Sequence, residues 1–146
     1  MKIMIRTFSL VFTAGVLVSI ASLAQDLTKE TVGLEATVLL KTTKTAADQP
    51  ISLPDTDKPE ITSMLVTVQP KGHSSLHQHP IPVVAYILEG AVEVREGGVA
   101  RKYSAGEAAV EPMNSPMQLF NPGDTIAKLL VVLVGAEGNP TSVAAH

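Results

Sequence analysis

Short apolar segments separated by turn residues run along the chain from residue 35 to residue 134, and none of them keeps a helical period. Ala91–Glu96 alternates apolar with charged residues, which is typical of a strand with one face in water, and Gly97-Gly98 predicts a hairpin turn after it. Strands are expected at residues 35–41, 61–68, 83–88, 91–96, 99–103, 108–111, 117–121 and 126–134. Short strands with frequent turns predict an all-β sandwich or barrel.

Residues 1–24 have the layout of a secretory signal peptide. A basic start precedes residues 10–23, which are apolar or small, and Ser22 and Ala24 are the small residues that a signal peptidase reads. The apolar run is too short to favour a membrane span. We therefore expect cleavage before Gln25 and a periplasmic or secreted protein, with an uncleaved anchor as the alternative.

The remaining chain has the length of one domain. Residues 25–59 are expected to hold a first strand and an irregular loop that contains prolines. Residues 60–135 are expected to form the folded core, and residues 136–146 a flexible tail.

Composition excludes several classes of partner. The net charge of the whole chain is −3, and it becomes about −5 when Lys2 and Arg6 leave with the signal peptide. A negative chain without a basic cluster is a poor partner for nucleic acid or an anionic membrane. The absence of cysteine excludes disulfides and thiolate metal sites. Few aromatic residues follow the signal peptide, which weighs against sugar or base stacking.

The strongest chemical signal is a group of histidines. His73, His77 and His79 lie close together and are three of the four histidines in the chain. His77 and His79 are two positions apart, so on a strand their side chains point to the same face. Two imidazoles on one face supply half of a metal site and suit Zn, Fe, Cu or Ni; the alternative is two polar residues at the start of a strand.

The segments around these histidines resemble the two motifs of the cupin family. The segment from Gly72 to Gly90 is similar to Gly-x5-His-x-His-x3,4-Glu-x6-Gly, and the segment from Gly106 to Asn121 is similar to Gly-x5-Pro-x-Gly-x2-His-x3-Asn. The resemblance spans roughly residues 60 to 135. It implies the double-stranded β-helix, or jelly-roll barrel, of a small single-domain cupin, and it implies a homodimer because cupins often pair through sheet edges.

Position by position, the resemblance leaves the family's metal site half complete. His77 and His79 match the histidines of the first motif. Val83 stands where the family has its liganding glutamate and cannot coordinate, while Met117 stands where the family has its last histidine. Met117 either fills the core or supplies a thioether. Asn114 replaces a turn glycine, which is a mild change because Asn tolerates positive φ.

Glu111 could supply the missing charge, because small cupins that resemble this chain carry Glu-Pro at this place. Strand parity argues against that role: if Val110 faces the core, Glu111 faces out. Four further side chains are expected to line the pocket: Val83, Ala85, Ile87 and Asn121.

These residues suggest an exported cupin barrel that binds a small molecule, one divalent transition metal (Fe, Mn, Zn or Cu), or both. A second hypothesis is a metal-dependent, dioxygenase-like oxidoreductase, which needs nitrogen and oxygen ligands with open positions. A third is a periplasmic copper-handling protein that uses His77, His79 and Met117, because a thioether binds Cu(I) well. No catalytic residue and no substrate can be assigned from the sequence.

Overall fold

The structure is a computed structural model that describes residues 32–145. The chain divides into two units, Met1–Thr37 and Val38–His146, and the nine strands of the described residues lie in the second. The described residues contain no helix, and therefore none that is long and apolar enough to cross a membrane. The predicted signal peptide lies outside the described residues, so its cleavage stays a prediction.

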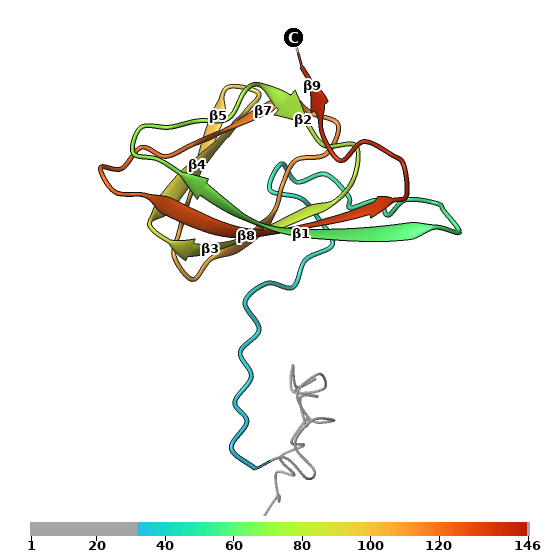
Figure 1. The fold of residues 1–146 in the computed structure, drawn as a ribbon, viewed down its shortest axis with the longest axis horizontal. Helices are drawn as coiled ribbons and strands as arrows, with labels where there is room; N and C mark the ends of the chain where they lie inside the picture. The colour runs from blue at the N-terminus through green and yellow to red at the C-terminus, as the bar shows by residue number, and fades with distance from the viewer. Residues whose placement is uncertain (1–31, 146) are drawn as a thin grey trace, which may run out of the picture. The chain divides into compact units, whose positions relative to one another are not determined.

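Two antiparallel sheets form a jelly-roll barrel, which confirms the expected fold class (Figure 1). The four-stranded sheet has the order β1 (Pro59–Val68), β8 (Ala127–Ala136), β3 (Val83–Glu89) and β6 (Ala108–Val110). The five-stranded sheet has the order β5 (Val99–Ser104), β4 (Ala91–Glu96), β7 (Met117–Phe120), β2 (His77–Gln78) and β9 (Val143–Ala144). β1 pairs only with β8 and is an edge strand; the expected homodimer stays a prediction.

The apolar core lies between the two sheets, because alternate residues of each central strand face inward. In the register of β3 with β8, Val83 pairs with Leu133 and Ile87 with Leu129. All four side chains are at most 2% exposed. Burying a side chain of this size stabilises the fold by about 1.5–3 kcal/mol, so these pairs hold the four-stranded sheet against its partner sheet.

Two turns have the backbone that their sequences predict. Gly97 and Gly98 have φ of 56° and 80° and join β4 to β5, as a two-residue hairpin turn with two left-handed positions requires. Asn114 has φ of 51°, which shows that it takes the backbone of the turn glycine it replaces.

Two terminal segments differ from the expected pattern. No strand forms at residues 35–41, because this segment pairs with none of the described strands. At the other end, the tail contains β9, whose Val143 and Ala144 pair with Gln78 and His77. The segment expected to be a flexible tail thus contributes a strand beside the histidines.

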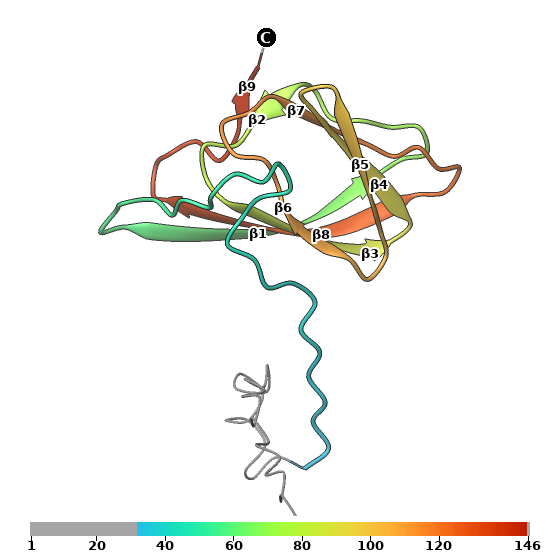
Figure 2. The same ribbon diagram turned by 180° about the vertical axis from the view of Figure 1, so that it is seen from behind.

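The loop from residue 44 to residue 51 lies next to β6 (Figure 2). The backbone N–H of Ala46 donates to the carbonyl oxygen of Val110 at 2.7 Å. The backbone N–H of Met113 donates to Oε1 of Gln49 at 3.1 Å. These bonds hold the segment between β6 and β7, which carries Glu111.

Candidate metal centre

A pocket of about 150 Å³ contains His77, His79, Glu111 and Met117. We call it the histidine pocket. It is lined by Met64, Val66, Ser74, His77, His79, Glu111, Met117, Leu119 and Val131. Four of the residues predicted from the sequence as metal ligands therefore lie in one pocket.

Both imidazole rings are held by backbone carbonyl groups. Nδ1 of His77 lies 2.8 Å from the carbonyl oxygen of Ser75, and Nδ1 of His79 lies 2.7 Å from that of Thr141. A carbonyl oxygen only accepts hydrogen bonds, so each Nδ1 carries the proton. In the neutral rings, Nε2 then has its lone pair free, which is the form in which histidine binds a metal ion. The ring centroids are 4.9 Å apart.

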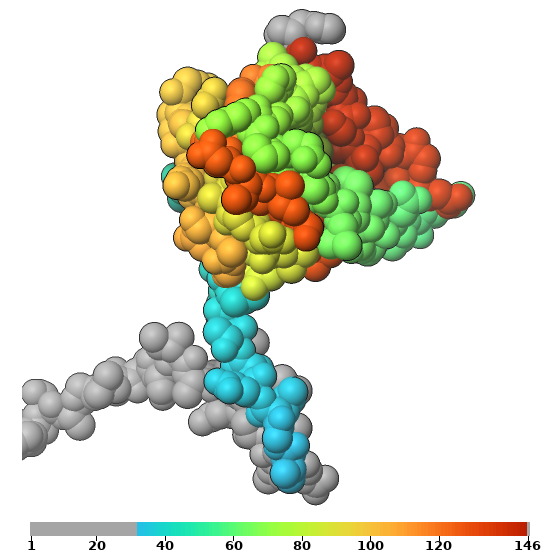
Figure 3. Space-filling view, turned by 60° about the vertical axis from the view of Figure 1, so that its left-hand side comes forward, coloured from blue at the N-terminus to red at the C-terminus, as the bar shows by residue number. Residues whose placement is uncertain are grey.

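The C-terminal segment provides one of these two carbonyl groups. Thr141 precedes β9, which pairs with β2. In the space-filling view, this red segment lies against the green part of the chain that carries β1 and the histidines (Figure 3). The tail therefore positions His79 directly.

Glu111 points into the barrel and faces His79. Its Oε2 lies 3.2 Å from Nε2 of His79, and both residues are 7% exposed. The parity argument against Glu111 does not apply, because β6 ends at Val110 and strict alternation ends with it. Val110 and Glu111 are consequently both buried.

The neighbours of His79 act on its pKa in opposite directions. Burial alone lowers the pKa, because an imidazolium loses its water. The hydrogen bond to Glu111, the hydrogen bond to the Thr141 carbonyl and the negative charge of Glu111 raise it, and together they bring the pKa of His79 above its ordinary value of 6.5. Without a metal ion, Glu111 and the Thr141 carbonyl therefore stabilise the protonated form of His79.

Met117 is the most deeply buried of the four predicted ligands. Its side chain is 0% exposed, and it pairs directly with His77 in the register of β7 with β2. Directly opposite residues of an antiparallel pair project from the same face of the sheet. The thioether therefore fills the position that the family motif gives to a third imidazole.

Nitrogen and oxygen donors do not complete the centre on their own. Within residues 32–145, no three His, Cys, Asp or Glu side chains form a group that could hold a metal ion. The close pair is His79 with Glu111, and His77 stands beside it. A complete centre in this geometry would include a donor of another type, and Met117 offers one in the same pocket.

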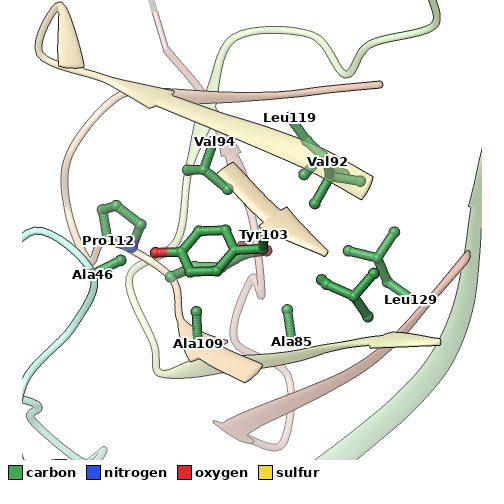
Figure 4. A pocket seen from close by; sticks show the side chains of 11 residues that line it. Ala46, Ala85, Val92, Val94, Tyr103, Ala109, Pro112, Leu119 and Leu129 are labelled. Carbon is green, nitrogen blue, oxygen red and sulfur yellow. The ribbon is translucent and has the colours of Figure 1, made fainter. Parts of the chain in front are cut away.

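Two of the predicted pocket residues line a second, narrower cavity, which we call the inner cavity. It is lined by Ala46, Ala85, Ile87, Val92, Val94, Tyr103, Ala109, Glu111, Pro112, Leu119 and Leu129 (Figure 4). Glu111 and Leu119 line both cavities. Burial raises the pKa of the Tyr103 phenol above its usual value of 10.0. Val83 is 1% exposed in the apolar core and lines neither cavity.

Asn121 stabilises a turn and lines neither cavity. Its Nδ2 donates to the carbonyl oxygens of Val68 at 3.0 Å and Thr125 at 2.8 Å. Its Oδ1 accepts from the backbone N–H of Gly123 at 2.9 Å. With its hydrogen-bonding groups engaged in this way, Asn121 joins the end of β1 to the turn before β8.

Sequence reasoning missed the apolar lining residues Val66, Leu119 and Val131, and it also missed Met64, Ser74 and Thr141. Met64 lies on β1, and it reaches the pocket because of the β1–β8 register, which no local sequence motif predicts. Ser74 lines the histidine pocket, and Thr141 acts through its backbone carbonyl. Because every residue has such a carbonyl group, no side-chain signal could have identified Thr141.

The chain is a member of the cupin superfamily. Residues 64–133 match the family model of the cupin domain, and this range includes β1 from Met64, both histidines, Glu111 and Met117. The match agrees with the jelly-roll barrel and with the two motifs around the pocket.

Solved structures similar to the chain include enzymes. One is the protein TT1209 from Thermus thermophilus, with 30% identity, a TM-score of 0.48, and coverage of 57% of this chain and 80% of that chain. Another is an oxalate oxidase, with 26% identity, a TM-score of 0.50, and coverage of 58% and 46%. The DMSP lyase DddQ from Ruegeria pomeroyi DSS-3 has 22% identity, a TM-score of 0.51, and coverage of 58% and 43%, and it shows the fold alone.

The chain spans less than half the length of the oxalate oxidase and of the lyase. No curated protein matches it.

Proposed function

We propose that this cupin binds one transition-metal ion in the histidine pocket. Nε2 of His79 and the carboxylate of Glu111 would be the close pair of ligands, with Nε2 of His77 beside them and a donor of another type completing the centre. The observation that carries the proposal is the buried contact of 3.2 Å between Nε2 of His79 and Oε2 of Glu111. A free lone pair on each Nε2, fixed by a carbonyl group on each Nδ1, supports it.

The contact has the length expected for two ligands of one ion. Nitrogen and oxygen ligands of a transition metal lie about 2.1 Å from it. Two such ligands 3.2 Å apart would subtend an angle of roughly 100° at the ion, between the octahedral and tetrahedral values. An ion could therefore replace the shared proton without moving either side chain far.

The donor set fits a bound ion but differs from the family's set. Val83 removes one carboxylate, and Met117 replaces one imidazole with a thioether. When bound, such an ion would act as a Lewis acid toward an oxygen-containing ligand. The chain's own residues orient the imidazoles, keep His79 and Glu111 away from bulk water, and hold one proton between them.

Binding of a small molecule in the histidine pocket is the second candidate function. A pocket of about 150 Å³ has room for a small organic molecule. Its lining combines apolar Val66, Leu119 and Val131 with a few polar groups, which is typical of ligand sites. The likeness to an oxalate oxidase keeps the dioxygenase-like alternative open, and a ligand screen with small carboxylic acids would test both.

Calorimetric titration with Zn(II) and Mn(II) tests the metal site. Protein without a polyhistidine tag should bind about one ion per chain, and His79→Ala or Glu111→Gln should weaken binding about tenfold to hundredfold. His73→Ala is the matched control, because His73 lies against Phe120 and does not line the pocket. Unchanged affinity in the His77→Ala/His79→Ala double variant would place the site elsewhere, and small-molecule binding would become the leading function.

Export and a homodimeric state complete the proposal. Export is supported by the layout of residues 1–24. A homodimer is supported by the edge position of β1, where Ile61 and Leu65 are 61% and 74% exposed. Light scattering of the purified protein tests the dimer, and a monomer at micromolar concentration would contradict it.

A further inference from the structure

Two methionines from opposite sheets line the histidine pocket. Met64 lies on β1 of the four-stranded sheet, and Met117 lies on β7 of the five-stranded sheet. Met64 is 43% exposed and Met117 is 0% exposed. The pocket therefore has one thioether accessible to solvent and one at its buried side.

The strand register explains why Met64 faces inward. Met64 pairs with Val131 in the register of β1 with β8, and Val131 belongs to the buried core. Directly opposite residues project from the same face, so the Met64 side chain extends from the inner face. Met117 reaches the same pocket as the register partner of His77.

We infer that the histidine pocket selects monovalent copper, with the thioethers of Met64 and Met117 acting beside Nε2 of His77 and His79. This inference rests on the proposed metal-binding function and names its ion. Thioethers are soft ligands that favour Cu(I), whereas Mn(II), Fe(II) and Zn(II) favour nitrogen and oxygen ligands. Nitrogen and oxygen donors of residues 32–145 do not complete a centre alone, and the two sulfur atoms are the donors that would complete it.

Charge balance also favours a monovalent ion. Imidazole and thioether ligands are neutral, so the only formal charge among these groups is the carboxylate of Glu111. Glu111 is 7% exposed, and a buried charge is stable when it is compensated. One Cu(I) ion would bring the net charge of the pocket to zero, whereas a divalent ion would leave one uncompensated positive charge.

The test compares Cu(I) with Zn(II) in methionine variants. Cu(I) affinity is measured by competition with a chromophoric Cu(I) chelator in the absence of oxygen, and Zn(II) affinity by calorimetry. Met64→Leu and Met117→Leu keep the side-chain volume nearly constant and remove the sulfur. Each should weaken Cu(I) about tenfold to hundredfold and leave Zn(II) affinity nearly unchanged.

Met113→Leu is the matched control, because Met113 is 7% exposed and pairs with His79 through a single bridge but does not line the pocket. Its affinities for both ions should equal those of the unmodified protein. X-ray absorption at the copper edge should detect sulfur neighbours in the unmodified protein and fewer in the Met64 and Met117 variants.

The outcomes separate this inference from the proposed function. Unchanged Cu(I) affinity in Met64→Leu overturns the inference, and because Met64 is 43% exposed this variant is expected to keep its fold. Equal losses of Cu(I) and Zn(II) affinity in a methionine variant also overturn the inference, because they indicate altered packing. The proposed metal site stands in that case. If the unmodified protein binds neither ion, the proposed function fails and the inference fails with it.

Discussion

The backbone N–H of Glu111 donates to the carbonyl oxygen of Val83 at 2.8 Å. Val83 occupies the position where cupins carry a liganding glutamate, and Glu111 supplies a carboxylate from the chain directly beside it. The charge that is missing from β3 is thus present on the segment that follows β6. The pocket keeps a negative charge although the motif has lost one.

The stability of the metal-free protein should depend on pH through His79 and Glu111. The folded-state pKa of His79 lies above 6.5, so the stabilisation from the pair is complete below the unfolded-state pKa of about 6.5 and is lost as the pH rises through the folded-state pKa. Glu111→Gln removes the charge that raises this pKa. With a chelator present, the melting temperature of the variant should therefore fall furthest below that of the unmodified protein near pH 6. A difference in melting temperature between the two proteins that stays constant from about pH 6 to about pH 9 would contradict this linkage.

Metal affinity should change with pH in the opposite direction. A proton and a metal ion compete for Nε2 of His79, and its raised pKa extends that competition to higher pH than for an ordinary imidazole. Zn(II) affinity should therefore weaken steadily from about pH 8 to pH 6. Calorimetry at several pH values measures the slope, and proton release on binding, from titrations in two buffers of different ionisation enthalpy, is the independent check.

Met117→His should tighten the binding of Zn(II) or Mn(II) by at least about tenfold. The new imidazole would stand at a 0% exposed position that lines the pocket opposite His77, and it would restore the third nitrogen of the family motif. Cu(I) affinity should fall relative to Zn(II), because a soft ligand is lost. Met113→His is the control, because Met113 is also a buried methionine but does not line the pocket. Leu119→His would not serve, since Leu119 lines the pocket. Equal gains in both variants would rule out a specific role for position 117.

Asn121→Ala should lower the free energy of unfolding by about 2–4 kcal/mol, because it leaves buried backbone groups without partners. The side chain is 2% exposed and bonds to Val68, Gly123 and Thr125. Urea denaturation measures the loss, and Asn139→Ala is the control because Asn139 is exposed. Metal affinity of the folded variant should remain close to that of the unmodified protein, since Asn121 does not line the pocket.

The exported product should begin at Gln25. Residues 10–23 are apolar or small, and Ser22 and Ala24 precede the expected cleavage site. Intact-mass spectrometry of the protein released from the producing cells measures its first residue. A mass that still includes residues 1–24 would mean that the segment is an anchor.

Local patterns predicted the strands because each strand carries its own alternation. The expected strands at 61–68, 83–88 and 91–96 correspond closely to β1, β3 and β4. The segment at 35–41 has similar β-branched character but forms no strand, because it pairs with no strand of either sheet. Composition describes a segment's preference and contains no information about whether a partner is available.

The candidate site was predictable only where a motif fixes the position of a side chain. The spacing of His77 and His79 placed two imidazoles together, and the second motif marked Met117. Glu111 could not be placed from parity, because the strand ends at the preceding residue. Met64 and Thr141 enter the site through long-range pairing of β1 with β8 and of β9 with β2, which a single sequence does not specify.

The pairing of β9 with β2 limits how the end of this chain can change. Inserting one residue between Thr141 and Val143 would either displace the carbonyl group that holds His79 or exchange the faces of Val143 and Ala144. An affinity tag joined after residue 146 would begin within a few residues of the strand beside His77, and its imidazoles would compete for the same ion. Residues 141–144 therefore support the histidine motif from the end of the chain, and related chains that end earlier should be expected to hold His79 in another way.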